Sequence, residues 1–122
     1  MYSTLLIGLL LFFAIEVNAQ ELNVKLADKV MMCESGGNVY ARNDNDKKIT
    51  GYSSFGLFQF QPSTFLKSGI RYRVFPEWFT ITDAMRYIYR PEYQGAIAHG
   101  LMADNEWFHW KNCVLKIARA AL

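Results

Sequence analysis

One acidic residue, Glu34, has the surroundings of a general acid. Apolar side chains recur at helical spacing over residues 21–34, and Ala27 and Val30 share a face with Glu34. Gly36-Gly37 then ends the helix, because glycine readily adopts the left-handed cap conformation. We expect Glu34 in the last turn, facing inward, where burial and the helix dipole both raise a carboxyl pKa. Such a carboxyl can act as a general acid; a structural carboxylate paired with a lysine or a backbone amide is the alternative.

The residues after Glu34 extend this motif. In chain order they are Cys33-Glu34-Ser35-Gly36-Gly37, Ala41-Arg42-Asn43, Ser54-Phe55-Gly56-Leu57-Phe58-Gln59 and Pro62-Ser63-Thr64. This order resembles the soluble lytic transglycosylase domain, a family marked by Glu-Ser at a helix end and, roughly 20 residues later, a Gly-Leu-Met-Gln-like segment. The resemblance covers about residues 21–113, although the Ala-Tyr-Asn segment that the family carries near its C-terminus is missing.

The resemblance implies a lysozyme-like fold of the α+β type, mainly α-helical, with a short β or loop region flanking a glycan cleft. It implies a lytic transglycosylase that cleaves the β-1,4 bond between N-acetylmuramic acid and N-acetylglucosamine in peptidoglycan and leaves a 1,6-anhydro end. Glu34 would be the acid and the base, with no cofactor. Further side chains would contact the glycan: Ser54, Phe58, Gln59, Tyr89 and Tyr93.

Several of these glycan contacts have a structural alternative. Gln59 is equally interpretable as a buried amide that holds its loop together, and the Phe58 ring favours the core. Tyr89 or Tyr93 would replace the missing C-terminal tyrosine of the family. Peptidoglycan strands are the expected partner, and we expect a monomer.

A hydrolytic lysozyme is the nearest alternative function. It requires a second carboxylate, for which Asp44 and Asp46 are the candidates. We interpret both as parts of a solvated turn, because Asp and Asn side chains stabilise turns by bonding to the backbone. A non-catalytic glycan-binding protein is a third alternative, but it would not need a buried acid. No metal site is predicted, since His99 and His109 lack the spacing of a helical zinc pair.

The predicted elements that position these residues are mostly helices. In addition to 21–34, helices are predicted at 62–69, 83–89, 91–103 and 112–122. Pro62 and Pro91 suit the first position of a helix, Thr82 suits an N-cap, and Gly69 suits a helix end. A polar loop is predicted at 38–54, and a short strand or a turn at 52–60.

Residues 1–19 are predicted to be a signal peptide. Leu5–Ile15 form an apolar run of suitable length, and Val17-Asn18-Ala19 provides the small residues for cleavage after Ala19. An uncleaved anchor is the alternative, although this run is shorter than the about 20 residues of a bilayer span. We expect a mature domain at 20–122, secreted or periplasmic, with no stable membrane span.

The remaining composition is consistent with an exported domain. The formal charge of +2 gives no indication of a nucleic-acid binder. The two cysteines, Cys33 and Cys113, are expected to form a disulfide, as exported chains with an even cysteine count usually do. The bridge would stabilise a small core by restricting the unfolded chain.

Overall fold

The computed structural model describes residues 24–122, and most of these residues lie in helices. The predicted signal peptide and its cleavage point lie outside the described residues. The first helix is described over residues 24–35. The later elements are β1 (Arg42–Asn43), α2 (Lys47–Thr50), β2 (Ser54–Phe55), α3 (Pro62–Arg71), α4 (Ile81–Met85), α5 (Pro91–Ala103), the 3-10 helix η1 (Trp107–Trp110) and α6 (Lys111–Ala120). The prediction of a mainly helical chain with a short β region is confirmed.

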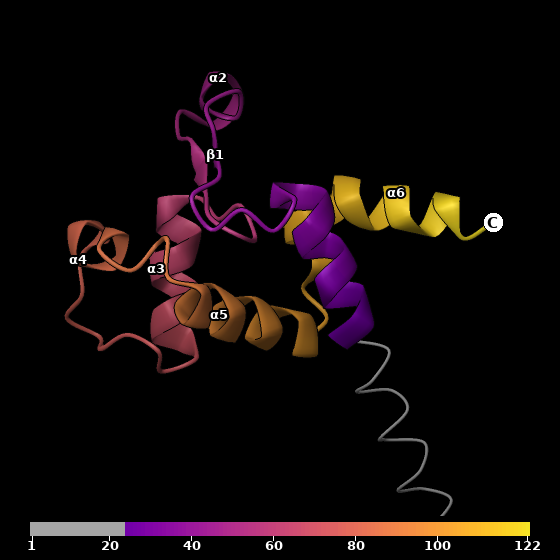
Figure 1. Ribbon diagram of the computed structural model, residues 1–122. Coiled ribbons are helices and arrows are strands. Elements are labelled where there is room, and N and C mark those ends of the chain that lie inside the picture. The colour runs from indigo at the N-terminus through magenta and orange to yellow at the C-terminus, as the bar shows by residue number, and fades with distance from the viewer. Residues whose placement is uncertain (1–23) are drawn as a thin grey trace, which may run out of the picture.

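The helices are accompanied by a small β-hairpin, which lies at one end of the molecule (Figure 1). Strands β1 and β2 pair antiparallel, with Asn43 opposite Ser54, and α2 lies between them in the chain. In Figure 1 this hairpin and α2 project from one end of the molecule, while α3, α4 and α5 pack together. The start of α6 lies against the first helix, so segments far apart in the chain meet there.

An aromatic core connects these elements. Phe60, Phe65 and Phe75 are buried, and neighbouring rings lie at centroid distances of 5.7 Å and 5.2 Å. Trp110 is buried beside them, and its indole N–H donates to the carbonyl of Phe58 at 2.8 Å. Large rings with their polar atom paired stabilise the core by burial without leaving an unsatisfied donor. The core thereby anchors η1 to the segment that follows β2.

Helix α5 has the predicted bounds, but two other helix boundaries differ from the prediction. Helix α3 begins at Pro62 as expected, yet it continues through Gly69 to Arg71. A Cβ on Gly69 would lie 2.1 Å from the Phe75 ring, so this glycine allows close packing rather than ending the helix. Thr82 is not an N-cap. Thr80 caps α4 instead, in a reciprocal capping box with Asp83.

Three other segments also differ from the prediction. Residues 86–89, predicted as helix, form turns. The predicted polar loop at 38–54 contains β1 and α2, and the C-terminal helix begins one residue early, after η1.

No helix within residues 24–122 is long and apolar enough to cross a bilayer.

The predicted disulfide is present. Cys33 at the end of the first helix is bonded to Cys113 in α6, with 5.9 Å between the Cα atoms and a sequence separation of 80. Closing so long a loop stabilises the folded state by about 4.5 kcal/mol in the chain-entropy description.

We expect the Cys33→Ser/Cys113→Ser variant to melt more than about 10 °C below the wild-type protein, because its unfolded chain is less restricted. Thermal unfolding by circular dichroism measures the difference. Wild-type protein reduced with dithiothreitol provides the control and should melt close to the double variant. Equal melting temperatures for oxidised and reduced wild-type protein would show that the bridge adds no stability.

Candidate active site

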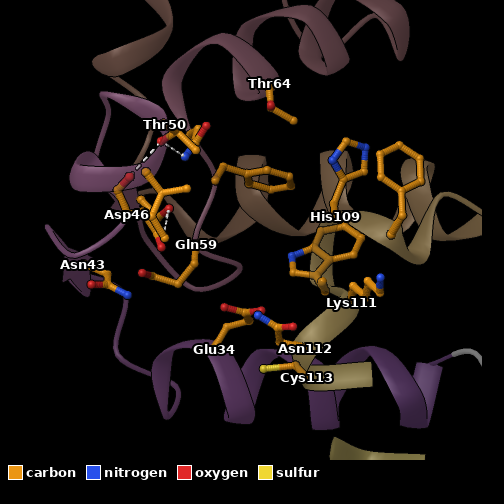
Figure 2. Close-up of a pocket in the computed structure, with 16 residues that line it drawn as sticks. Glu34, Asn43, Asp46, Thr50, Gln59, Thr64, His109, Lys111, Asn112 and Cys113 are labelled. Atoms are coloured by element: carbon orange, nitrogen blue, oxygen red, sulfur yellow. Dashed lines mark hydrogen bonds between the residues drawn. The ribbon is translucent and has the colours of Figure 1, made fainter. Parts of the chain in front are cut away.

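A pocket of about 540 Å³ opens between the hairpin and the C-terminal segment (Figure 2). Glu34 lies at its base, at the end of the first helix. Asp46 and Thr50 come from one wall, and His109 and Lys111 come from the opposite wall. The remaining lining residues are mostly polar: Asn43, Ile49, Ser54, Gln59, Phe60, Gln61, Thr64, Phe108, Trp110, Asn112 and Cys113. The pocket therefore combines two half-buried acids, Glu34 and Asp46, with many hydrogen-bonding groups.

Glu34 occupies the position that the helical pattern predicts. The helix ends at Ser35, one residue after Glu34, and Gly36 and Gly37 both have positive φ, at 64° and 80°. Burial, and after it the negative charge of Asp46, together raise the pKa of the Glu34 carboxyl from 4.5 to about 7. A substantial fraction of Glu34 is therefore protonated at neutral pH, as a general acid requires.

Asp46 is a second carboxylate in this pocket. Its Oδ2 accepts a hydrogen bond from the Ser54 hydroxyl at 2.6 Å, and the pairing of β1 with β2 brings these two residues together. The interpretation of Asp46 as only a solvated turn residue is therefore incomplete. No local pattern distinguishes it from Asp44, because the contact with Ser54 depends on how the two strands pair.

Asp44 does not line the pocket. It is exposed, pairs with Arg42 at 2.7 Å and accepts a hydrogen bond from the Ser53 hydroxyl at 2.5 Å. The hydrogen bonds from Ser53 and then from Arg42 lower the pKa of Asp44. The turn interpretation holds for this residue.

Ser54 and Gln59 line the pocket, as expected from the motif. Ser54 is buried, with its hydroxyl bonded to Asp46. Gln59 has a positive φ of 54°, and its side-chain Nε2 donates to the carbonyls of Gly56 at 2.9 Å and Ala41 at 3.2 Å. Gln59 thus holds its loop together and also borders the pocket, so its two interpretations are compatible.

Gln94, which had no expected role, holds the turn between Ser54 and Gln59 in place. It is fully buried on α5; its Oε1 accepts from the backbone N–H of Phe58, and its Nε2 donates to the carbonyls of Phe55 and Ile88. Gly56 has a φ of 81°, and a Cβ there would lie 2.4 Å from the Gln94 amide nitrogen. The glycine of the motif is needed for this close approach.

Three expected glycan contacts do not reach the pocket. Phe58 is only 4% exposed, with its ring against Trp110 in the core. Tyr93 stacks on Phe75 at 5.8 Å, because that face of α5 packs into the aromatic core. Tyr89 packs against two other rings, Tyr40 and Phe55. Phe58, Tyr89 and Tyr93 are therefore not among the residues that line the pocket with Glu34, and their contact with the glycan stays a prediction.

The wall opposite Asp46 comes instead from η1 and the start of α6. The Cys33–Cys113 bridge holds this segment beside Glu34, since it joins the residue before Glu34 to the residue after Asn112. Figure 2 shows Asn112 next to Glu34 at the base of the pocket. The sequence motif contains no signal for this wall, because the contact spans 80 residues.

Comparison with protein-family models, curated proteins and solved structures gives no match to this chain. The function is therefore inferred from the chemistry of the pocket. Within residues 24–122, no group of three or more histidine, cysteine, aspartate or glutamate side chains is arranged to hold a metal ion. The groups available for chemistry in the pocket are the Glu34 and Asp46 carboxyls and the polar side chains around them.

Proposed function

We propose that this protein is a peptidoglycan lytic transglycosylase with a lysozyme-like fold and with Glu34 as its acid and base. The observation that carries the proposal is the half-buried Glu34 carboxyl, whose pKa is raised to about 7, at the base of a pocket lined mostly by polar residues. A glycan presents many hydroxyl and amide groups, which match the hydrogen-bonding side chains of the two walls. The motif around Glu34 supports the same reaction.

In the proposed reaction, protonated Glu34 donates its proton to the oxygen that bridges N-acetylmuramic acid and N-acetylglucosamine. The bond from C1 of the muramic residue to that oxygen breaks, and positive charge develops at C1. The resulting Glu34 carboxylate takes the proton of the muramic C6 hydroxyl as that oxygen bonds to C1. The products are a free 4-hydroxyl and a 1,6-anhydro ring, and Glu34 regains its proton.

Asp46 contributes an electrostatic effect to this scheme. Its negative charge raises the pKa of the Glu34 carboxyl, which keeps more of the acid protonated near neutral pH. Its hydrogen bond from Ser54 holds the carboxylate in position. Because the muramic hydroxyl is already part of the bound sugar, its attack needs no ordered water, and such intramolecular geometry lowers a barrier by at most about 7 to 11 kcal/mol.

A hydrolytic muramidase is the second candidate, and Asp46 is the observation that favours it. A retaining hydrolase uses two carboxyl groups about 5 Å apart, and an inverting one uses a wider pair that holds a water. Asp46 and Glu34 line one pocket, so the pocket contains the two carboxyl groups that a hydrolase uses. The test is the release of fragments from purified peptidoglycan and the mass of their muramic ends. Ends lighter by one water support the lyase, and no release by folded protein overturns both candidates.

Lysis should decline as the pH rises through about 7, because the proton that Glu34 donates is lost there. Initial rates of release from purified peptidoglycan, measured from pH 4.5 to 9 at constant ionic strength, give the apparent pKa of the declining limb. A limb near the ordinary carboxyl pKa of 4.5, with little activity at pH 6, would contradict the assignment of Glu34 as the acid.

The disulfide is consistent with an oxidising compartment, where such bonds form and persist. We therefore propose a secreted or periplasmic location for the protein, in contact with the cell wall that contains the substrate.

A further inference from the structure

Phe108 has an exposed ring in the wall of the pocket. In η1 the side chains of Trp107 and Trp110, three residues apart, point to the same side, as the 3-10 spacing dictates, and both pack against the core. Phe108 lies between them in the chain and is 65% exposed, whereas Trp110 is 2% exposed. The fold needs the two tryptophans for packing, but it gives the Phe108 ring no comparable partner in the core.

Phe108 and His109 together form a continuous aromatic surface. Their ring centroids lie 4.2 Å apart with planes inclined by 32°, and both residues line the pocket that contains Glu34. Figure 2 shows His109 across the pocket from Asp46, with Glu34 at the base between them. A ligand that reaches both walls would therefore pass over Glu34 and meet the aromatic surface.

We propose that Phe108 and His109 form a carbohydrate subsite that binds one pyranose ring of the glycan. The proposal rests on the proposed function, since it assigns a subsite to the same pocket. The apolar face of the sugar would stack on Phe108, and the imidazole of His109 would hydrogen-bond a hydroxyl or acetamido group.

The chemistry of the pocket favours a sugar over a wholly apolar ligand. A pyranose has an apolar C–H face and polar edges, and the pocket that Phe108 lines also has hydrogen-bonding residues in its walls, such as Gln61, Thr64 and Asn112. Burial lowers the pKa of His109, although Glu106 at 3.9 Å acts in the opposite direction. At neutral pH the imidazole is therefore mainly uncharged and can both donate and accept a hydrogen bond.

The test measures binding rather than cleavage. Peptide-free glycan strands from purified peptidoglycan are titrated into the Glu34→Gln protein, and calorimetry gives the Kd. Adding Phe108→Ala should raise the Kd about three- to tenfold, the scale of one aromatic contact, whereas Phe108→Trp should keep it near the parent value. Trp78→Ala is the matched control, because Trp78 is 73% exposed and does not line this pocket.

Each outcome of this titration either supports or overturns the proposed subsite. A larger Kd for Phe108→Ala, with rescue by Phe108→Trp and no change for Trp78→Ala, supports it. An unchanged Kd for Phe108→Ala, an equal loss for Trp78→Ala, or no binding by the parent protein overturns it. The proposed function is judged separately, by release of fragments from peptidoglycan by the wild-type protein, so glycan binding through Phe108 without such release would refute the enzyme and retain the subsite.

Discussion

Replacing Glu34 by glutamine should lower the rate of peptidoglycan lysis by at least about a hundredfold, the usual scale for loss of a general acid. Glutamine keeps the shape of the side chain and removes its titratable proton. Because Glu34 both donates and accepts the proton in the proposed reaction, its replacement removes both proton transfers. The rate of fragment release from purified peptidoglycan at pH 6 measures the effect.

Glu77→Gln is the matched control for this variant. Glu77 is exposed and does not line the pocket with Glu34, so its replacement makes the same chemical change without touching the site. Lysis by Glu77→Gln should equal that of the wild-type protein. Near wild-type lysis by folded Glu34→Gln would remove Glu34 from the mechanism.

Thermal unfolding provides an independent test of the raised pKa. The pKa of Glu34 is about 7 in the folded state and 4.5 as its ordinary value, so the folded protein binds more protons between these pH values. The stability that Glu34 contributes is fully present below pH 4.5 and is lost as the pH rises through about 7. Glu34→Gln should therefore gain melting temperature relative to the wild-type protein between pH 4.5 and pH 8. If the difference in melting temperature between Glu34→Gln and the wild-type protein stayed the same across this pH range, the raised pKa of Glu34 would be contradicted.

The glycan products should end almost entirely in 1,6-anhydromuramic acid. These ends are lighter by one water than hydrolytic ends, and they resist borohydride because they have no reducing group. The expectation follows from the intramolecular attack of the muramic hydroxyl, which replaces a bound water. Mass analysis of the released fragments, with and without borohydride, distinguishes the two reactions.

The Asp46→Asn variant also distinguishes the lyase from the hydrolase. In the lyase, Asp46 acts through its charge on Glu34, so the variant should keep most of its activity at pH 5 to 6 while the declining limb moves to lower pH. Asp44→Asn is the control, since Asp44 pairs with Arg42 outside the pocket. Reducible products, together with loss of turnover at every pH in folded Asp46→Asn, would establish the hydrolase instead.

The sequence alone determined the features that depend on nearby residues. Apolar spacing and the two glycines placed Glu34 at an inward helix end, because helix periodicity and glycine caps are local effects. Pro91 marked the start of α5 for the same reason. The disulfide followed from there being only two cysteines.

The tertiary structure decided which distant residues share the pocket. Asp46 and Asp44 are alike in the sequence, and only the pairing of β1 with β2 brings one to the Ser54 hydroxyl and the other to the Ser53 hydroxyl. Gly69 is typical of a helix end in the sequence, but in the structure it allows Phe75 to pack against α3. Tyr93 and Phe108 are both aromatic, yet the core buries part of the first and leaves the second in the pocket wall. Each outcome depends on contacts between segments separated along the chain, which side-chain packing and strand pairing select and local spacing does not encode.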